Sequence, residues 1–196
     1  MLQDIQAVVF DLDNTLVSSS LNFPLIRQEL GCEAKGDLLK FIENMPLEQQ
    51  AVATKRVVDH ELDDAHSSYP LAGCHDLLAT IKKLNLNTAI VTRNCQQAAQ
   101  IKVKNNKIDI PIVLTREEHP AKPAPDALLH LAELWQITPE SILYVGDYLY
   151  DVQTAHNANA KSCLVSLTKD IEYAEQAHLV VDDLVELNQR FVELSR

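Results

Sequence analysis

The chain has 196 residues, of which 46% are hydrophobic and 23% are charged, as in a globular protein with one large domain or a domain carrying an insertion. Its formal net charge of −11 argues against nonspecific nucleic-acid binding and gives an anionic substrate no general attraction. Because no apolar run reaches a membrane-spanning length and MLQDIQ lacks a signal-peptide pattern, we expect a cytoplasmic protein with no membrane contact.

The first predicted element is a strand at Val8–Phe10, apolar enough to be buried on both faces as in parallel sheets. Asp11 follows at its carboxyl end, and Asp13 lies two residues later. Residues two apart in an extended chain point the same way, so both carboxylates are expected to face one pocket. Two such acids repel each other unless a proton or a cation relieves them.

The next stretch is predicted to be all helical, with helices at 23–31, 36–45 and 46–66. Pro24 suits a first helical turn and Gly31 suits a helix end. Beyond YPLAG, strands alternate with helices. The strands are expected at 87–92, 110–115, 141–147, 161–167 and 178–183, and the helices at 96–104, 123–135, 150–158 and 184–194. This order predicts an α/β fold with a parallel sheet between helices (residues 1–17 and 70–196) and an inserted all-helical cap (residues 18–69).

Ligands of open parallel sheets bind outside the carboxyl ends of the strands, so the residues that leave each strand there are the candidates for chemistry. They are Asp11 and Asp13, Thr92 and Arg93, the loop from Thr115 to Lys122, and Gly146 with Asp147. Each piece alone has an ordinary explanation. Acids and threonines cap helices, and a loop lysine is usually solvated. Their occurrence after successive strands favours a site.

These residues resemble the motifs of the haloacid dehalogenase superfamily of aspartate-nucleophile enzymes. DLDNT matches DxDx[TV], Thr92 lies in IVTRN, Lys122 lies in KPAPD, and GDYLYD matches GDxxxD. The helical insertion resembles the cap of subfamily I, close to its phosphoglycolate phosphatase-like members, and the resemblance implies a Rossmann-like core. Two departures are Tyr148, where a small Ser or Thr is common, and Asn159, where a helix-ending Gly is usual but Asn tolerates the left-handed conformation.

The resemblance and phosphoryl-transfer chemistry together imply a Mg²⁺-dependent phosphatase that acts on a small phosphorylated metabolite. A phosphate dianion repels a carboxylate nucleophile, so a divalent cation is needed between them. Asp11, Asp147 and the backbone carbonyl of Asp13 are the expected metal ligands, and Asp151 is expected to hold a metal-bound water or to orient Lys122.

The remaining roles follow the order of the reaction. Asp11 is expected to attack phosphorus and become an aspartyl-phosphate, with Asp13 as the acid and then the base. Thr92, Arg93 and Lys122 are expected to bind the phosphate, with help from backbone N–H groups near a helix N-terminus.

Other functions compete with this hypothesis. A phosphomutase of the beta-phosphoglucomutase type shares every motif, and a catalytically inactive binding protein could keep the same fold. The acid Asp13 argues against a dehalogenase, which has no alkoxide to protonate. With only four glycines, dinucleotide and P-loop motifs are absent. Phosphoglycolate, sugar phosphates and nucleotide monophosphates all remain open as substrates, as does the oligomeric state.

Two further expectations concern the cap and the cysteines. The acids and histidines of 59–66 are expected on a solvated helix surface, and the cap is expected to close about hinges near 17–20 and 69–73. The four cysteines are widely spaced and form no CxxC pair, so free thiols are favoured over disulfides or a zinc site.

Overall fold

The centre of the molecule is a six-stranded parallel sheet with the strand order β3-β2-β1-β4-β5-β6. A computed structural model describes residues 2–166 and 171–194. The strands are β1 (Ala7–Phe10), β2 (Asn87–Val91), β3 (Ile112–Leu114), β4 (Ile142–Gly146), β5 (Lys161–Val165) and β6 (Leu179–Val181). This arrangement confirms the Rossmann-like α/β fold class. The predicted strand at 161–167 ends at Val165, and its last predicted residue, Leu167, lies outside the described residues.

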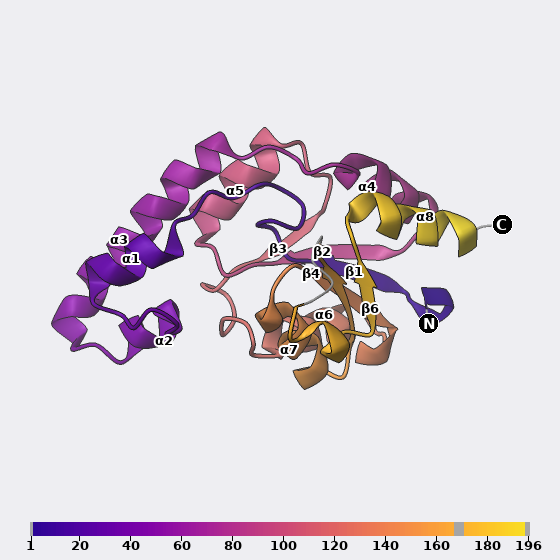
Figure 1. Ribbon diagram of the computed structural model, residues 1–196. Coiled ribbons are helices and arrows are strands. Elements are labelled where there is room, and N and C mark those ends of the chain that lie inside the picture. Colours follow the sequence, from indigo (N-terminus) through magenta and orange to yellow (C-terminus); the bar gives the residue numbers. More distant parts are fainter. Residues whose placement is uncertain (1, 167–170, 195–196) are drawn as a thin grey trace.

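Helices cover both faces of the sheet (Figure 1). They are α1 (Phe23–Leu30), α2 (Leu38–Glu43), α3 (Leu47–Ser67), α4 (Cys74–Lys83), α5 (Gln96–Asn105), α6 (Asp126–Trp135), α7 (Leu149–Asn157) and α8 (Leu184–Leu194), with short 3₁₀ helices at Leu2–Asp4, Pro139–Ser141 and Ala174–Gln176. Among the described residues, no helix combines the length and apolarity needed to cross a membrane.

Strand β1 lies between β2 and β4 in the sheet, and its side chains are buried on both faces. Val8 and Phe10 pack into a cluster with α4 and α8, whereas Ala7 and Val9 pack toward α6 on the other face. All four residues have no exposed surface, as the unbroken apolar run predicts. Strand β1 therefore brings Asp11 to the carboxyl edge of the sheet, between β2 and β4.

Helix α4 was not predicted from the sequence. Its buried residues Cys74, Leu77, Leu78 and Ile81 have helical spacing, and they pack on the same face of the sheet as α8. The segment was missed because it directly follows the YPLAG break and precedes an obvious strand. Helix α4 completes the crossover from β1 to β2 by packing on the sheet, as helices between parallel strands usually do.

Helices α1 to α3, here called the inserted helices, come between β1 and α4 in the chain and extend away from the core (Figure 1). The two connecting segments pair with each other: Val17 forms an antiparallel bridge with Pro70, and Ser18 N–H donates to Tyr69 C=O at 2.8 Å. Gly73, expected at a hinge, has a φ of 79° and lies so close to α8 that an added Cβ would be 2.7 Å from the Val185 nitrogen. Close packing and a left-handed backbone account for this glycine.

Local sequence explains the ends of the inserted helices. Asn22 caps α1 by accepting a hydrogen bond from Leu25 N–H at 3.0 Å, Pro24 lies in the first turn, and Gly31 ends the helix with a φ of 72°. Asp37 caps α2 in the same way. The cysteines are free thiols, as expected, and Cys32 is only partly buried.

Candidate active site

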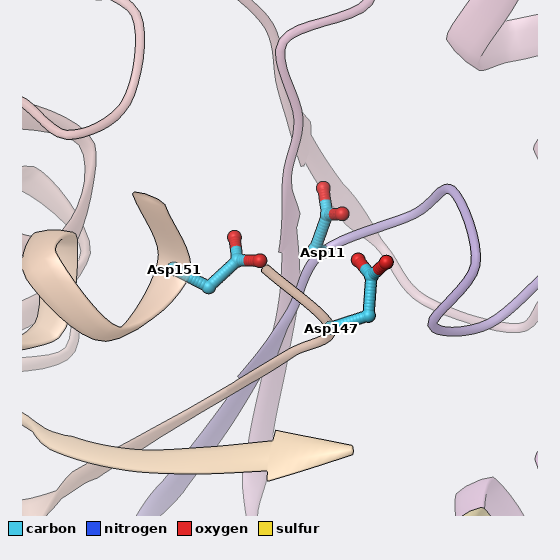
Figure 2. A group of neighbouring side chains, drawn as sticks. All are labelled: Asp11, Asp147 and Asp151. Carbon is cyan, nitrogen blue, oxygen red and sulfur yellow. The ribbon is translucent and has the colours of Figure 1, made fainter. Parts of the chain in front are cut away.

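Three carboxylates meet at the carboxyl edge of the sheet (Figure 2). Asp11 follows β1, and its N–H still donates to Val145 C=O of β4 at 2.8 Å, so the sheet fixes its backbone. Asp147 follows β4, and Asp151 lies in the first turn of α7. One carboxylate oxygen from each of these residues lies within 4.8 Å of the others. The structure therefore brings three of the four predicted metal-site residues together by their side chains.

Gly146 is required by the position of Asp151. A Cβ at Gly146 would lie 2.2 Å from the carboxyl carbon of Asp151, which no side chain permits. Asp151 uses one oxygen to accept a hydrogen bond from Tyr148 N–H at 3.0 Å, which fixes the start of α7. Its other oxygen accepts from Lys122 at 2.7 Å. The four-residue spacing between Asp147 and Asp151 in GDxxxD thus places the Asp151 carboxylate against Gly146 at the end of β4.

Lys122 is the cation of this site. Its side chain is 5% exposed, and Nζ donates to Asp11 at 2.6 Å and to Asp151 at 2.7 Å. Burial alone would lower the pKa of Lys122, but the charges of Asp11 and Asp151 outweigh it and raise the pKa well above its ordinary value. Lys122 is therefore a permanent positive charge beside Asp11.

One ammonium group does not balance three acids. Burial raises the pKa of Asp11 to about 7, despite the opposing effect of Lys122, and the neighbouring Asp151 adds to the rise. Burial and the charges of Asp11 and Asp151 raise the pKa of Asp147 to about 8. Three acids that offer only oxygen ligands, two buried and one partly buried, with a single ammonium group among them, form the donor set that suits a hard divalent cation such as Mg²⁺.

Asp147 is expected to make the stability of the metal-free protein depend on pH. The pKa of Asp147 is higher in the folded chain than in the unfolded chain, so its ionisation destabilises the fold increasingly as pH rises from about 4 to above 8. In chelator at about pH 8.5, Asp147→Asn should raise the free energy of unfolding by about 1–2 kcal/mol, and the gain should shrink toward pH 5. Thermal melts across pH measure this. Exposed Asp63→Asn is the control, and a destabilised Asp147→Asn protein would contradict the electrostatic account.

Asp13 lies on the pocket wall but is held by a different set of residues. One carboxylate oxygen accepts from Lys102 Nζ of α5, and the other accepts from Asn94 at 3.0 Å. Burial raises the pKa of Asp13, and Lys102 and Asn94 oppose that rise. Neither Lys102 nor Asn94 was predicted as a site residue. Lys102 is fully buried in α5, where the pattern of QQAAQIKVK predicts only a helix.

Thr92 is buried at the end of β2 and lines the same pocket. Its hydroxyl accepts hydrogen bonds from the backbone and side-chain nitrogens of Asn94 at 3.2 and 3.1 Å. The neighbouring helix N-terminus differs from the expectation of a phosphate site. In α5, Cys95 N–H donates to Glu61 at 3.0 Å and Gln96 N–H donates to Glu117 at 3.2 Å, so two carboxylates already occupy this end.

Arg93 is engaged by the inserted helices. Its guanidinium pairs with Asp37 of the α2 cap at 2.6 and 3.1 Å and donates to Lys122 C=O at 2.7 Å. It also lies over the Tyr150 ring, 4.6 Å from the centroid. Among the predicted phosphate-binding residues, Arg93 is thus the one that pairs with a carboxylate of the inserted segment, whereas Lys122 pairs with acids of the site itself.

The acids of α3 differ from the sequence expectation. Asp59 and Asp63 are on the surface, but Glu61 and Asp64 are buried. Glu61 pairs with Arg116 at 2.6 Å, and Asp64 pairs with Lys102 at 2.6 Å. The signal was present in the spacing, because both acids belong to the buried stripe of Ala53, Val57, Glu61, Asp64 and Ala65.

A pocket of about 410 Å³ lies over the carboxylates, between the sheet edge and the inserted helices. The core residues in its lining include Asp11, Asp13, Thr92, Arg93, Asn94, Lys122, Asp147 and Asp151. Its upper wall contains Leu21, Phe23, Arg27, Leu38 and Val57. Tyr148, the departure from the motif, is half exposed beside this pocket and packs edge-on against Tyr150 and Tyr173.

Comparisons with known proteins agree with this arrangement. A family model described as haloacid dehalogenase-like hydrolase matches residues 25–165. The uncharacterized hydrolase YOR131C of Saccharomyces cerevisiae is 32% identical over 202 residues, covering 95% of this chain and 90% of the yeast protein.

Two solved structures extend the agreement to the fold. A hydrolase from Pseudomonas syringae is 25% identical with a TM-score of 0.78, covering 96% of this chain and 98% of the other. A protein described as a predicted phosphoglycolate phosphatase, from Haemophilus somnus, shares the fold at 18% identity and a TM-score of 0.74, covering 98% and 99% of the two chains. The family inferred from the motifs is confirmed, and this chain belongs to the haloacid dehalogenase-like hydrolases.

Proposed function

We propose that the protein is a Mg²⁺-dependent phosphatase that hydrolyses a small phosphate monoester by way of an aspartyl-phosphate on Asp11. The observation that carries the proposal is the placement of Asp11. Its carboxylate is fixed at the end of a buried strand, bonded to the buried cation Lys122, and open to a pocket that it shares with Asp147 and Asp151.

The residues present fit a magnesium ion. Asp11 and Asp147 would hold it by their side chains and Asp13 by its backbone carbonyl, with Asp151 supporting a bound water. When bound, the ion supplies positive charge that lets a phosphate dianion approach the acids. The raised pKa values of Asp11 and Asp147, caused first by burial and then by the neighbouring acids, support this assignment, because a bound cation would offset both effects.

The chain's own residues divide the chemistry between them. A carboxylate oxygen of Asp11 forms a bond to phosphorus while the bond from phosphorus to the ester oxygen breaks. Asp13 gives its proton to that departing oxygen, then takes a proton from the water that hydrolyses the aspartyl-phosphate. Lys122 offsets the charge of Asp11 and the phosphate, and Thr92 binds a phosphate oxygen. Arg93 is assigned to holding Asp37, which caps α2, so that the inserted helices lie beside the pocket.

The inserted helices are proposed to act as a cap domain, residues 18–69, over a core of residues 1–17 and 70–196. They supply Leu21, Phe23 and Leu38 to the upper wall of the pocket, where the alcohol part of a substrate would lie. Shielding from bulk water strengthens the interactions of Asp11 and Lys122 with a phosphate group. The substrate proposed for this space is a small phosphorylated metabolite.

The test of the proposed function is a comparison of leaving groups in Asp13→Asn. The wild-type protein should release phosphate from alkyl and nitrophenyl phosphates when Mg²⁺ is present. The variant should lose about 10²–10⁴-fold in kcat/KM for alkyl esters and much less for nitrophenyl esters, because a nitrophenolate departs without a proton. A wild-type protein that hydrolyses no ester in a panel of phosphorylated metabolites would rule the function out, and equal losses for both ester types would rule out the acid–base role.

A further inference from the structure

Lys102 is the most deeply buried charged residue among those that the structure describes, and it has no role in the proposed chemistry. It lies in the middle of α5, its side chain has no exposed surface, and its ammonium group lies between two carboxylates. One is Asp13 of the core, and the other is Asp64 of α3 at 2.6 Å. A buried ammonium group strongly destabilises the fold unless it is paired, so both acids are needed to hold it.

The two acids belong to different parts of the molecule. Helix α3 lies along α5 (Figure 1), and Ala65, Cys95 and Ala98 form an apolar contact between them. Asp64 also accepts hydrogen bonds from Ser19 Oγ at 2.8 Å and from the backbone and hydroxyl of Ser20 at 2.6 and 2.8 Å. Asp64 therefore holds Ser19 and Ser20, in the segment that leaves the core, against α3. Lys102 connects this cluster to Asp13 through its second ion pair.

We propose that Lys102 is a positioning residue that acts through Asp13 and links the docking of α3 to the placement of the proposed acid–base group. The link rests on the proposed function for its chemical consequence, but the coupling between the groups does not depend on it. When α3 is docked, the ammonium group of Lys102 donates to both Asp64 and Asp13, and Asn94 donates to the second carboxylate oxygen of Asp13. Displacing α3 breaks the ion pair between Lys102 and Asp64, so that Asp13 is then the single carboxylate paired with Lys102. We expect the orientation of the Asp13 carboxylate at the pocket wall to change as a result.

The coupling predicts a reversal in thermal stability that requires no activity. In the wild-type background, Asp64→Asn should lower the melting temperature, because Lys102 loses a buried partner. In the Lys102→Met background, the same change should raise the melting temperature, because it removes one of two buried acids that no longer share a cation. Asp63→Asn, one residue away and exposed, should leave the melting temperature unchanged in both backgrounds. The same sign of the Asp64→Asn effect in both backgrounds would overturn the link between Lys102 and Asp64.

The chemical consequence is tested in the charge-balanced variant Lys102→Met/Asp64→Asn, which should fold even where Lys102→Met alone does not. Its kcat/KM for alkyl phosphates relative to nitrophenyl phosphates should fall by about tenfold or more, the signature expected when the acid is misplaced. Adding Asp13→Asn should then cost less on alkyl esters than the same change costs in the wild-type background, because both changes act through the one group Asp13. An unchanged ester ratio, or fully multiplicative losses, would show that Lys102 serves folding alone and would overturn the proposal.

The two failures are distinguishable. A wild-type protein without phosphatase activity would remove the proposed function, whereas the melting-temperature reversal would still decide whether Lys102 joins α3 to Asp13. A functioning phosphatase whose Lys102→Met/Asp64→Asn variant keeps the wild-type ester ratio would remove the inference and leave the proposed function intact.

Discussion

Asp11→Asn is expected to reduce the turnover of every phosphate ester by at least about 10³-fold, because the amide cannot act as the nucleophile. Asparagine has nearly the same shape as aspartate and can still accept a hydrogen bond from Lys122, so the fold should persist. The loss should appear for both alkyl and nitrophenyl phosphates, since both esters need the Asp11 carboxylate to attack phosphorus. Steady-state kcat with both ester types measures it, and circular dichroism and a thermal melt show whether the variant folds.

The covalent intermediate gives this prediction a second readout. Asp13→Asn should accumulate an aspartyl-phosphate with nitrophenyl phosphate, because it forms the adduct without an acid but lacks the base that activates water. Mass spectrometry of acid-quenched protein should find the phosphoryl group on the peptide that contains Asp11, and Asp11→Asn/Asp13→Asn should carry none. Asp63→Asn serves as the matched control, with wild-type kinetics. An Asp11→Asn protein that keeps substantial turnover, once deamidation is excluded, would show that the reaction does not use this carboxylate.

The sheet was accessible from the sequence because its signals are local. The apolar run of Val8–Phe10 predicts a doubly buried strand, and the chain order of strands and helices predicts a parallel sheet. Parallel sheets bring their carboxyl ends to one edge, so Asp11, Lys122 and Asp147 could be expected at one site before any distance was known. The structure places their side chains together as that rule requires.

The cluster behind Asp13 was not accessible in the same way. Asp64 and Lys102 are 38 residues apart, and each alone suits a solvated helix surface. Burial of either depends on the other lying opposite it across two packed helices, which is a property of the tertiary structure. The usable local signal was weak: Glu61 and Asp64 interrupt an apolar stripe at positions where a hydrophobic residue would ordinarily lie.

Arg93 shows a second limit of the same kind. Its position after β2 predicts that it reaches the pocket, and it does line the pocket. Its partner could not be foreseen, because Asp37 lies 56 residues away in the inserted helices and also looks like an ordinary helix cap. Strand order can thus place a residue at the sheet edge, but the inserted segment decides which charges there remain available to a substrate.

Removal of divalent cations is the second change with a large expected effect. Excess chelator should abolish hydrolysis, and Mg²⁺ should restore it, because the crowded acids would otherwise repel the phosphate from Asp11. Ca²⁺ should inhibit, since its larger and looser coordination would disturb the alignment between Asp11 and the phosphate. The measurement is the initial rate with nitrophenyl phosphate after chelation and stepwise addition of each ion.

Binding itself should be visible without turnover. Mg²⁺ should raise the melting temperature of the wild-type protein most above about pH 8, where both Asp11 and Asp147 are otherwise ionised in the metal-free protein. The rise should be smaller at about pH 5, where protons compete with the ion. Asp147→Asn should lose most of this increase, whereas Asp63→Asn should keep it. Full activity in excess chelator would refute the metal assignment. An equal Mg²⁺ stabilisation of Asp147→Asn and the wild-type protein would show that the ion binds away from the three carboxylates, because Asp147 contributes one of the three carboxylate oxygens that converge there among the described residues.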